Sequence, residues 1–187
     1  MKTLVNGILA GVAVLLAGCA GVSDSYYLLT AAGPAPSGGG PGIGVGPVSV
    51  AEYADRSNLI FQSGPQKLEV AESHHWAGEV RKSVATAMAA NLGRQLGTGN
   101  VRTYPWERDD ELRYQVAIDI RQFHGTSDGQ ALLEASWRVY QLPGGRLISA
   151  RSGTYLELQR RDGFEELAAA QSRALVRLAE DIARGMR

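Results

Sequence analysis

The clearest pattern in the chain is an alternation of apolar and polar residues between Leu112 and Phe123. Apolar side chains occupy every second position, and the positions between them include Arg113, Gln115, Asp119 and Arg121. Because successive residues of a strand point to opposite faces, this pattern predicts a strand with one buried face and one face in water.

Two further stretches extend this strand into a predicted antiparallel meander. Ala131–Tyr140 alternates in the same way, and its apolar positions include Trp137. Pro143-Gly144-Gly145 then provides a turn, after which Arg146–Leu158 returns as a third strand. The second half of the chain therefore predicts three sequential antiparallel strands.

Two long stretches instead repeat their apolar residues with the period of a helix. One runs from Gly78 to Leu96 and the other from Gly163 to Met186, and each has one apolar face. Asp162 precedes the second stretch and Glu165 lies in its first turn, which favours Asp162 as the N-cap residue.

The remaining apolar segments are short and predict further strands: Ser25–Thr30, Val48–Ala51, Leu59–Gln62, Lys67–Ala71 and Val101–Tyr104. The length of the chain suits one domain. We therefore expect a single-domain α/β fold. Its mixed sheet of about six strands includes the C-terminal antiparallel meander, and two long amphipathic helices pack on it.

A segment rich in Gly and Pro, residues 31–46, follows the first predicted strand. It is either a flexible linker between a membrane and the folded body or a long loop inside the domain. Two tyrosines followed by two leucines, Tyr26–Leu29, are a poor composition for a free tether. We therefore expect Ser25–Thr30 to join the sheet, so that residues 31–46 form an internal loop of a domain spanning residues 25–187.

The N-terminus has the features of a targeting signal. Lys2 is followed by an apolar run from Gly7 to Ala17, which is too short to cross a bilayer and typical of a signal peptide. The run ends in Leu16-Ala17-Gly18-Cys19, which resembles the lipobox of bacterial lipoproteins. The resemblance implies a signal peptide over residues 1–18, lipid attachment at Cys19 and a lipidated tether over residues 19–24. A plain secretory signal with a chance cysteine is the alternative.

Ala20 follows the predicted lipidated cysteine. In the familiar sorting rule for bacterial lipoproteins, an Asp at this position retains the protein at the inner membrane. Its absence favours the outer membrane, with the domain on the periplasmic face.

Composition and charge exclude several classes of function. The 19 basic and 19 acidic residues balance, so the sequence predicts no basic face for a nucleic-acid partner. Cys19 is the single cysteine, which excludes an internal disulfide framework and a cysteine-based zinc cluster. If Cys19 carries lipid, it is neither a catalytic nucleophile nor a metal ligand.

The pentapeptide Gly125–Gly129 matches the G-x-S-x-G pattern of a hydrolase nucleophile elbow, with Ser127 at its centre. That elbow must join a strand to a helix so that the serine is held exposed. Both flanks here alternate with period two, and Asp128-Gly129 is a common pair in hairpin turns. We therefore interpret the motif as a turn between two strands and expect no catalytic residue.

Other residues suggest a metal site or an aromatic ligand platform. His75 and Glu79 are spaced by one helical turn and His74 is adjacent, but a zinc site needs three or four ligands in fixed geometry. We expect no metal or cofactor, with His74 and His75 preceding the helix. We expect the tryptophans to pack in the core, and Trp76 in particular against the sheet: Trp76, Trp106 and Trp137.

Five short strings occur in order along the chain: Tyr26–Leu29, Ile43–Val48, Tyr53–Arg56, Leu68–Glu72 with Trp76-Ala77, and Tyr104–Trp106. Together they resemble the PqiC-like family of ABC-type transport auxiliary lipoproteins over nearly the whole chain after Cys19. The resemblance implies a layered fold like that of anticodon-binding domains and a role that is not enzymatic.

The same resemblance implies an accessory, docking subunit of an intermembrane lipid-transport system that supports envelope integrity. Such lipoproteins are anchored to the outer membrane and form ring-shaped homo-oligomers. They act with a mammalian-cell-entry (MCE) tunnel protein and an inner-membrane permease. We expect the wet face of the strand with Arg113 and Arg121 to be one patch of the ring. The alternative is an anchored periplasmic hydrolase or ligand-binding module.

Overall fold

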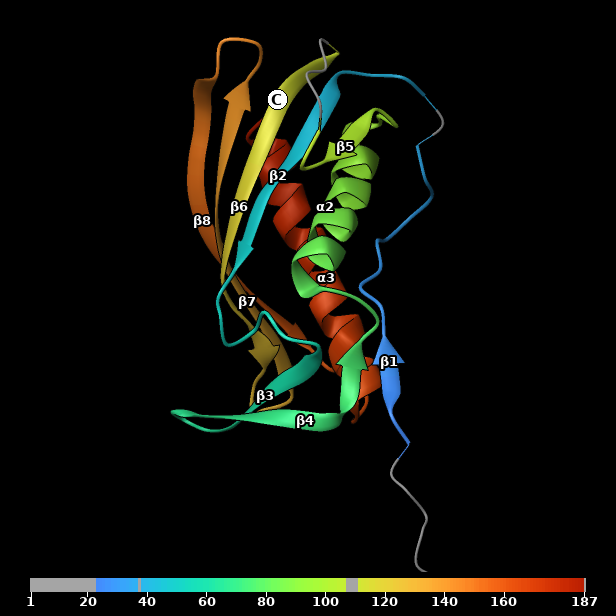
Figure 1. Ribbon diagram of the computed structural model, residues 1–187, viewed down its shortest axis with the longest axis vertical. Coiled ribbons are helices and arrows are strands. Elements are labelled where there is room, and N and C mark those ends of the chain that lie inside the picture. The colour runs from blue at the N-terminus through green and yellow to red at the C-terminus, as the bar shows by residue number, and fades with distance from the viewer. Residues whose placement is uncertain (1–22, 37, 107–110, 187) are drawn as a thin grey trace, which may run out of the picture.

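The computed structural model describes residues 23–36, 38–106 and 111–186 (Figure 1). These residues form one α/β domain with an eight-stranded mixed sheet and two helices. The elements follow in the order β1 (Ser25–Tyr27), β2 (Gly42–Val50), β3 (Asn58–Gly64), β4 (Lys67–Trp76), α2 (Val80–Leu96), β5 (Val101–Thr103), β6 (Leu112–Gly125), β7 (Gln130–Gln141), β8 (Arg146–Leu158) and α3 (Phe164–Arg184). The predicted signal peptide and Cys19 lie outside the described residues.

Strand β6 lies at the centre of the sheet and pairs with three other strands. It pairs parallel with β2 and antiparallel with β7, which in turn pairs antiparallel with β8. The predicted meander is thereby confirmed. Strand β5 pairs parallel with the other side of β2. At its far end β6 meets β3 through the pair Phe61 and Gly125, and the sheet continues through β4 to β1.

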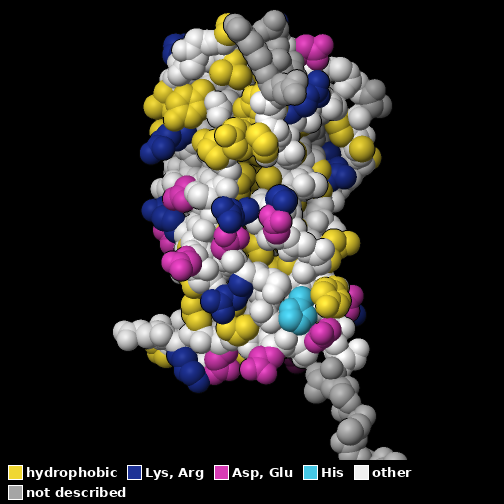
Figure 2. Space-filling view, in the orientation of Figure 1, with side chains coloured by type: hydrophobic (Ala, Val, Ile, Leu, Met, Phe, Trp, Pro, Cys, Tyr) yellow, Lys and Arg dark blue, Asp and Glu magenta, His cyan; other side chains and the backbone are white. Residues whose placement is uncertain are grey.

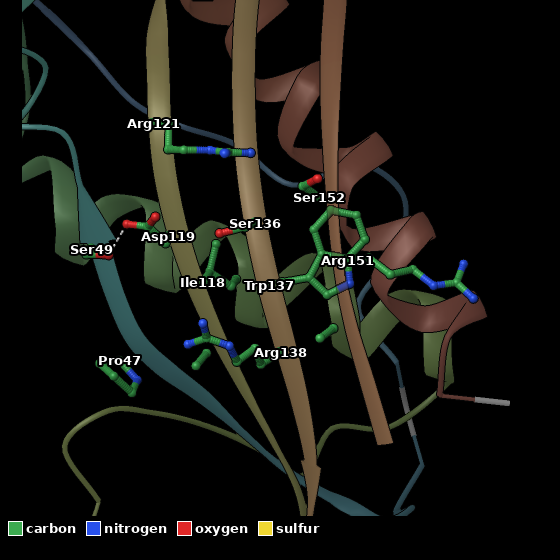
Figure 3. A pocket seen from close by; sticks show the side chains of 12 residues that line it. Pro47, Ser49, Ile118, Asp119, Arg121, Ser136, Trp137, Arg138, Arg151 and Ser152 are labelled. Atoms are coloured by element: carbon green, nitrogen blue, oxygen red, sulfur yellow. Dashed lines mark hydrogen bonds between the residues drawn. The ribbon is translucent and has the colours of Figure 1, made fainter. Parts of the chain in front are cut away.

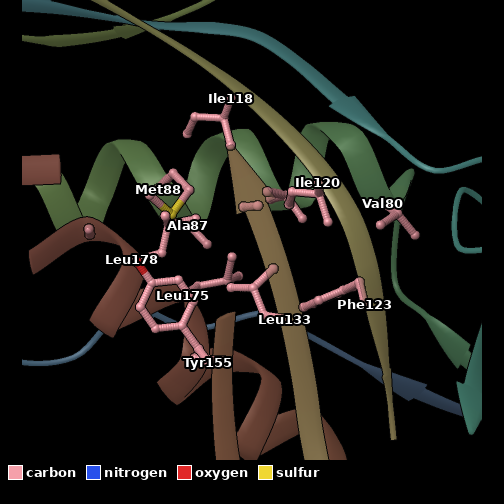
Figure 4. Close-up of a cluster of buried hydrophobic side chains, with 14 of the residues drawn as sticks. Val80, Ala87, Met88, Ile118, Ile120, Phe123, Leu133, Tyr155, Leu175 and Leu178 are labelled. Atoms are coloured by element: carbon pink, nitrogen blue, oxygen red, sulfur yellow. The ribbon is translucent and has the colours of Figure 1, made fainter. Parts of the chain in front are cut away.

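Both helices pack on one face of this sheet, and the core lies between the two layers (Figures 1 and 4). The predicted alternation in β6 is confirmed, because Val116, Ile118 and Ile120 are at most 1% exposed. They lie in the same buried cluster as Met88 of α2 and Leu175 of α3. The opposite face of β2, β6, β7 and β8 carries no helix, and we call it the outer sheet face.

The helix ends follow local chemistry. Helix α2 ends at Gly97, whose φ of 67° is the left-handed conformation that glycine adopts without strain. The prediction of Asp162 as the cap of α3 is wrong, because Gly163 is the N-cap residue. Its φ of 111° suits glycine, and no side chain caps the helix. Glu165 and Glu166 lie in the first turn, where the helix dipole favours negative charge.

The segment after β1 is a packed internal loop, as predicted. Strand β1 pairs parallel with β4, and the chain then crosses the helix pair. The amide of Thr30 donates a 3.1 Å hydrogen bond to Oγ of Ser172 on α3, and the amide of Ala32 donates one of 3.2 Å to Oδ1 of Asn91 on α2. These bonds hold the loop to both helices.

The predicted extent of this loop, residues 31–46, is wrong at its end, because β2 begins at Gly42. Ile43 and Val45 are fully buried in the core. A Cβ on Gly42 would lie 2.4 Å from the carbonyl oxygen of Glu111, so glycine is required there by close approach of the backbone. The eight strands overlap the eight segments that the sequence predicts one by one, so the predicted total of about six strands was too low.

Candidate functional site

The centre of the outer sheet face is a row of small polar side chains. Ser49, Asp119, Ser136 and Ser152 are successive register partners across β2, β6, β7 and β8. Residues in register share a face, so these four side chains lie side by side. The hydroxyl of Ser49 donates a 2.6 Å hydrogen bond to Oδ1 of Asp119.

A hollow of about 510 Å³ lies over this row (Figure 3). The neighbouring row consists of Ala117, Arg138 and Ala150, so small side chains leave room around the arginine. The helices lie on the far side of the strands in this view. Among the described residues, Arg138 is exposed and forms no ion pair, which leaves its charge accessible to a partner.

Arg113 and Arg121 lie on this face, as the period-two pattern predicts, and both are exposed. Arg121 is already engaged, because its guanidinium lies 3.3 Å from the Glu134 carboxylate on β7. The side-chain amide nitrogen Nε2 of Gln122 donates a 2.5 Å hydrogen bond to the same carboxylate. Arg138 is therefore a cleaner probe of the face than Arg121. The alternation of apolar and polar residues in β7 already predicts that Arg138 lies on the polar side of that strand.

Aromatic and apolar side chains occupy the other end of the outer sheet face. Gln115 is in register with Tyr140, and Tyr140 with Leu147, which is 50% exposed. Tyr104 is 58% exposed and meets the Trp106 ring edge-on at 5.5 Å. Hydrophobic side chains gather in the upper half of this view (Figure 2). The face is thus apolar at one end and polar in the middle.

The prediction that every tryptophan is a core residue is wrong for Trp106. Trp137 is 3% exposed and Trp76 is 5% exposed, and Trp76 stacks on Phe123 of the sheet as expected. Trp106 is only partly buried, because it lies over Gly44 on the outer sheet face. A Cβ at Gly44 would approach its ring to 2.7 Å, so the missing side chain makes room for the indole.

Tyr53 lies beside the C-terminal end of β6. Its hydroxyl accepts a 3.1 Å hydrogen bond from the amide of Phe123 and lies 2.8 Å from Nδ1 of His124, to which it can donate its own hydrogen. Burial raises the pKa of Tyr53 above its ordinary value, and the bond from Phe123 opposes that rise. Burial lowers the pKa of His124, which favours the neutral ring that accepts this bond.

The motif around Ser127 is a hairpin turn, as predicted. Strand β6 ends at Gly125 and β7 begins at Gln130, so the serine joins two strands rather than a strand and a helix. The amide of Thr126 donates a 2.7 Å hydrogen bond to the carbonyl of Gln130, and Gly129 has a φ of 77°. Ser127 is exposed on this turn without the strand-to-helix geometry of a nucleophile elbow.

The histidines that suggested a metal site hold β1 in place instead. Nδ1 of His74 lies 2.7 Å from the Tyr27 hydroxyl, and its ring stacks on Phe164 at 4.0 Å. His75 stacks on Tyr26 at 5.5 Å. Glu79, the third candidate ligand, pairs with Lys82 at 2.8 Å. Within residues 23–36, 38–106 and 111–186, no three His, Cys, Asp or Glu side chains gather as a metal site would require.

Neither described helix is long and apolar enough to cross a membrane. The sequence model of a family described as the ABC-type transport auxiliary lipoprotein component matches residues 26–183, which run from β1 to α3. The chain is also 26% identical over 182 residues to the intermembrane transport lipoprotein PqiC of Escherichia coli (strain K12). That alignment covers 92% of this chain and 94% of the relative.

Two solved structures share the fold. One is a crystal structure of an uncharacterized protein, with a TM-score of 0.74 and 20% identity over 88% of this chain and 99% of that chain. The other is the protein XCC0632 of Xanthomonas campestris, with a TM-score of 0.66 and 18% identity over 85% of this chain and 92% of that chain. Both likenesses extend over nearly the whole described domain.

Proposed function

The chain belongs to the family of ABC-type transport auxiliary lipoprotein components, and on that premise we propose that it is the outer-membrane docking subunit of an MCE-type system that moves lipids between membranes. The observation that carries the proposal is the match over residues 26–183 together with the relative named as an intermembrane transport lipoprotein. The role that follows is to bind partner proteins at the membrane rather than to catalyse a reaction.

In this proposal the outer sheet face is the docking surface. It has an apolar end around Tyr104 and Leu147, which can bury area against a partner. Its centre is a shallow polar hollow, where Arg138 offers a charge. A strand face without a covering helix can receive either a second copy of the chain, as in a ring, or the MCE partner.

Membrane attachment through Cys19 is the second part of the proposal. Several acyl chains hold a protein on a bilayer durably, whereas one binds only marginally. Ala20 after the cysteine favours the outer membrane. A Cys19→Ser variant is expected to leave uncleaved precursor or a soluble form, detected by fractionation and by incorporation of labelled palmitate. Unchanged fractionation and labelling would contradict lipid attachment.

Arg138→Glu tests the docking surface in a strain that lacks the native protein. The expected result is loss of complementation and of cross-linking to the MCE-domain protein, with normal abundance. Lys82→Glu is the matched control, since it makes the same change of charge at an exposed position of α2 in the helical layer. Equal behaviour of the two variants would discard the outer sheet face as the docking surface.

The ring is tested separately by light scattering on the lipid-free domain. We expect a closed homo-oligomer, as the family resemblance implies, and such a ring requires one patch of each subunit to meet a different patch of the next. A monomer at tens of micromolar would contradict the ring. The hollow on the outer sheet face is also compatible with a ligand-binding module, and saturable binding of a small lipid that competes with the MCE partner would favour that alternative.

A further inference from the structure

The lower end of the molecule is formed by the β3–β4 hairpin, residues 58–76. In Figure 1 this hairpin lies across the end of the domain and runs crosswise to the long strands β6 to β8. Strand β1 starts at the same end, because Ser25 is in register with His74 of β4. The chain therefore enters the fold beside the hairpin.

Covalent reach limits how far this end can be from the predicted lipid. Ser25 is six positions after Cys19, and an extended residue spans at most about 3.3–3.6 Å, so the start of β1 lies within about 22 Å of the predicted lipidated cysteine. Strand β4 has ten residues, which corresponds to a length of about 33 Å. The hairpin is thus long enough to lie along a surface that the anchor holds close by.

Several apolar side chains at this end of the molecule are exposed. Leu68 is 41% exposed and Val70 is 40% exposed, and both lie on β4 on the same side of the strand. Tyr26 of the adjoining β1 is 66% exposed. Single exposed apolar residues are common, but here they gather at the end from which the predicted anchor leaves.

The charge of the hairpin is small. Lys67 pairs with Glu69 at 2.6 Å, which leaves Glu72 as the one further charged side chain between residues 58 and 76. A surface held by basic residues would prefer anionic lipid and weaken in salt. The hairpin carries no cluster of basic residues, so its contact with a bilayer would depend on its apolar side chains.

We propose that the β3–β4 hairpin rests on the lipid surface to which the chain is anchored, with Leu68 and Val70 in the headgroup region. The inference rests on the proposed lipid attachment at Cys19 and adds a second point of contact. Two contacts at one end fix the tilt of the domain, so the long strands stand away from the membrane. The outer sheet face then stands roughly perpendicular to the membrane surface.

The experiment uses the full acylated lipoprotein in vesicles of phosphatidylethanolamine and phosphatidylglycerol. Because Cys19 is the single cysteine and is consumed by lipid, a new cysteine can be labelled selectively with an environment-sensitive NBD dye. Leu68→Cys and Val70→Cys carry the label on the hairpin. Leu147→Cys is the matched control, since it is 50% exposed at the start of β8, at the opposite end of the long strands.

We expect blue-shifted NBD emission at Leu68 and Val70, and at least twofold stronger quenching by nitroxide lipids than at Leu147. The quenching should be the same in low and high salt and with less anionic lipid. Equal quenching at all three sites, or a blue shift without lipid quenching, would overturn the inference. Flotation and the mass of the acylated chain report the anchor separately, so an anchored protein with a water-exposed hairpin would leave the proposed function intact.

Discussion

Replacing Tyr53 with phenylalanine tests how firmly the loop after β2 is held against the end of β6. The hydroxyl bridges the amide of Phe123 and the ring of His124. These two residues are only 2% and 5% exposed, so water does not readily replace the lost oxygen. An unpaired buried polar group costs about 1–3 kcal/mol, and the loss of two partners therefore predicts a destabilisation of about 2–4 kcal/mol.

Tyr155→Phe is the matched control. Tyr155 is buried, whereas Tyr53 is partly buried, and the Tyr155 hydroxyl donates one 2.8 Å hydrogen bond to Asp181, whose side chain is 31% exposed. Water can solvate that carboxylate, so we expect a loss of only about 1 kcal/mol. Urea unfolding followed by circular dichroism gives both free energies, with midpoints that fall at constant slope. A loss in Tyr53→Phe no larger than in Tyr155→Phe would refute the reasoning.

Three further substitutions test separate features. Gly42→Ala should cost about 1–3 kcal/mol in thermal or urea unfolding, because its Cβ would collide with the carbonyl of Glu111, whereas Gly144→Ala, with nothing within 4 Å, should be tolerated. His124→Gln should flatten the decline in stability of the native protein below pH 6.5. Burial lowers the pKa of the native histidine, so the unfolded chain binds more protons as the pH falls from 6.5 toward the folded pKa. Ser127→Ala should change stability by less than about 0.5 kcal/mol and leave complementation intact, since the residue lies on an exposed turn; loss of function at normal abundance would revive the hydrolase alternative.

The strands and helices with one buried face were predictable from the sequence. In β6 and β7 a residue such as Val116 or Trp137 faces the helices while its neighbours face water, so burial leaves a period of two in the sequence. In α3 the buried side chains recur at helical spacing for the same reason. The polar middle of the candidate docking surface was predictable to the same extent, because it includes the polar positions of β6 and β7.

The start of β2 was not predictable in this way. Gly42 and Gly44 suggest a linker by composition, yet each is needed because another part of the chain comes too close for a side chain. That contact joins β2 to residues more than 60 positions away, which no local pattern reveals. The same applies to Trp106, whose place on the outer sheet face depends on the space over Gly44.

The parallel pairing of β1 with β4 also determines how the domain bears tension. A pull on the N-terminal end of β1 acts along the strand, across three register pairs and the Tyr27 to His74 bond. These contacts are loaded together in shear rather than opened one after another. The loop that follows is tied to α3 at Ser172 and to α2 at Asn91, so the load next reaches the helical layer. The outer sheet face lies on the other side of the core from these helix contacts.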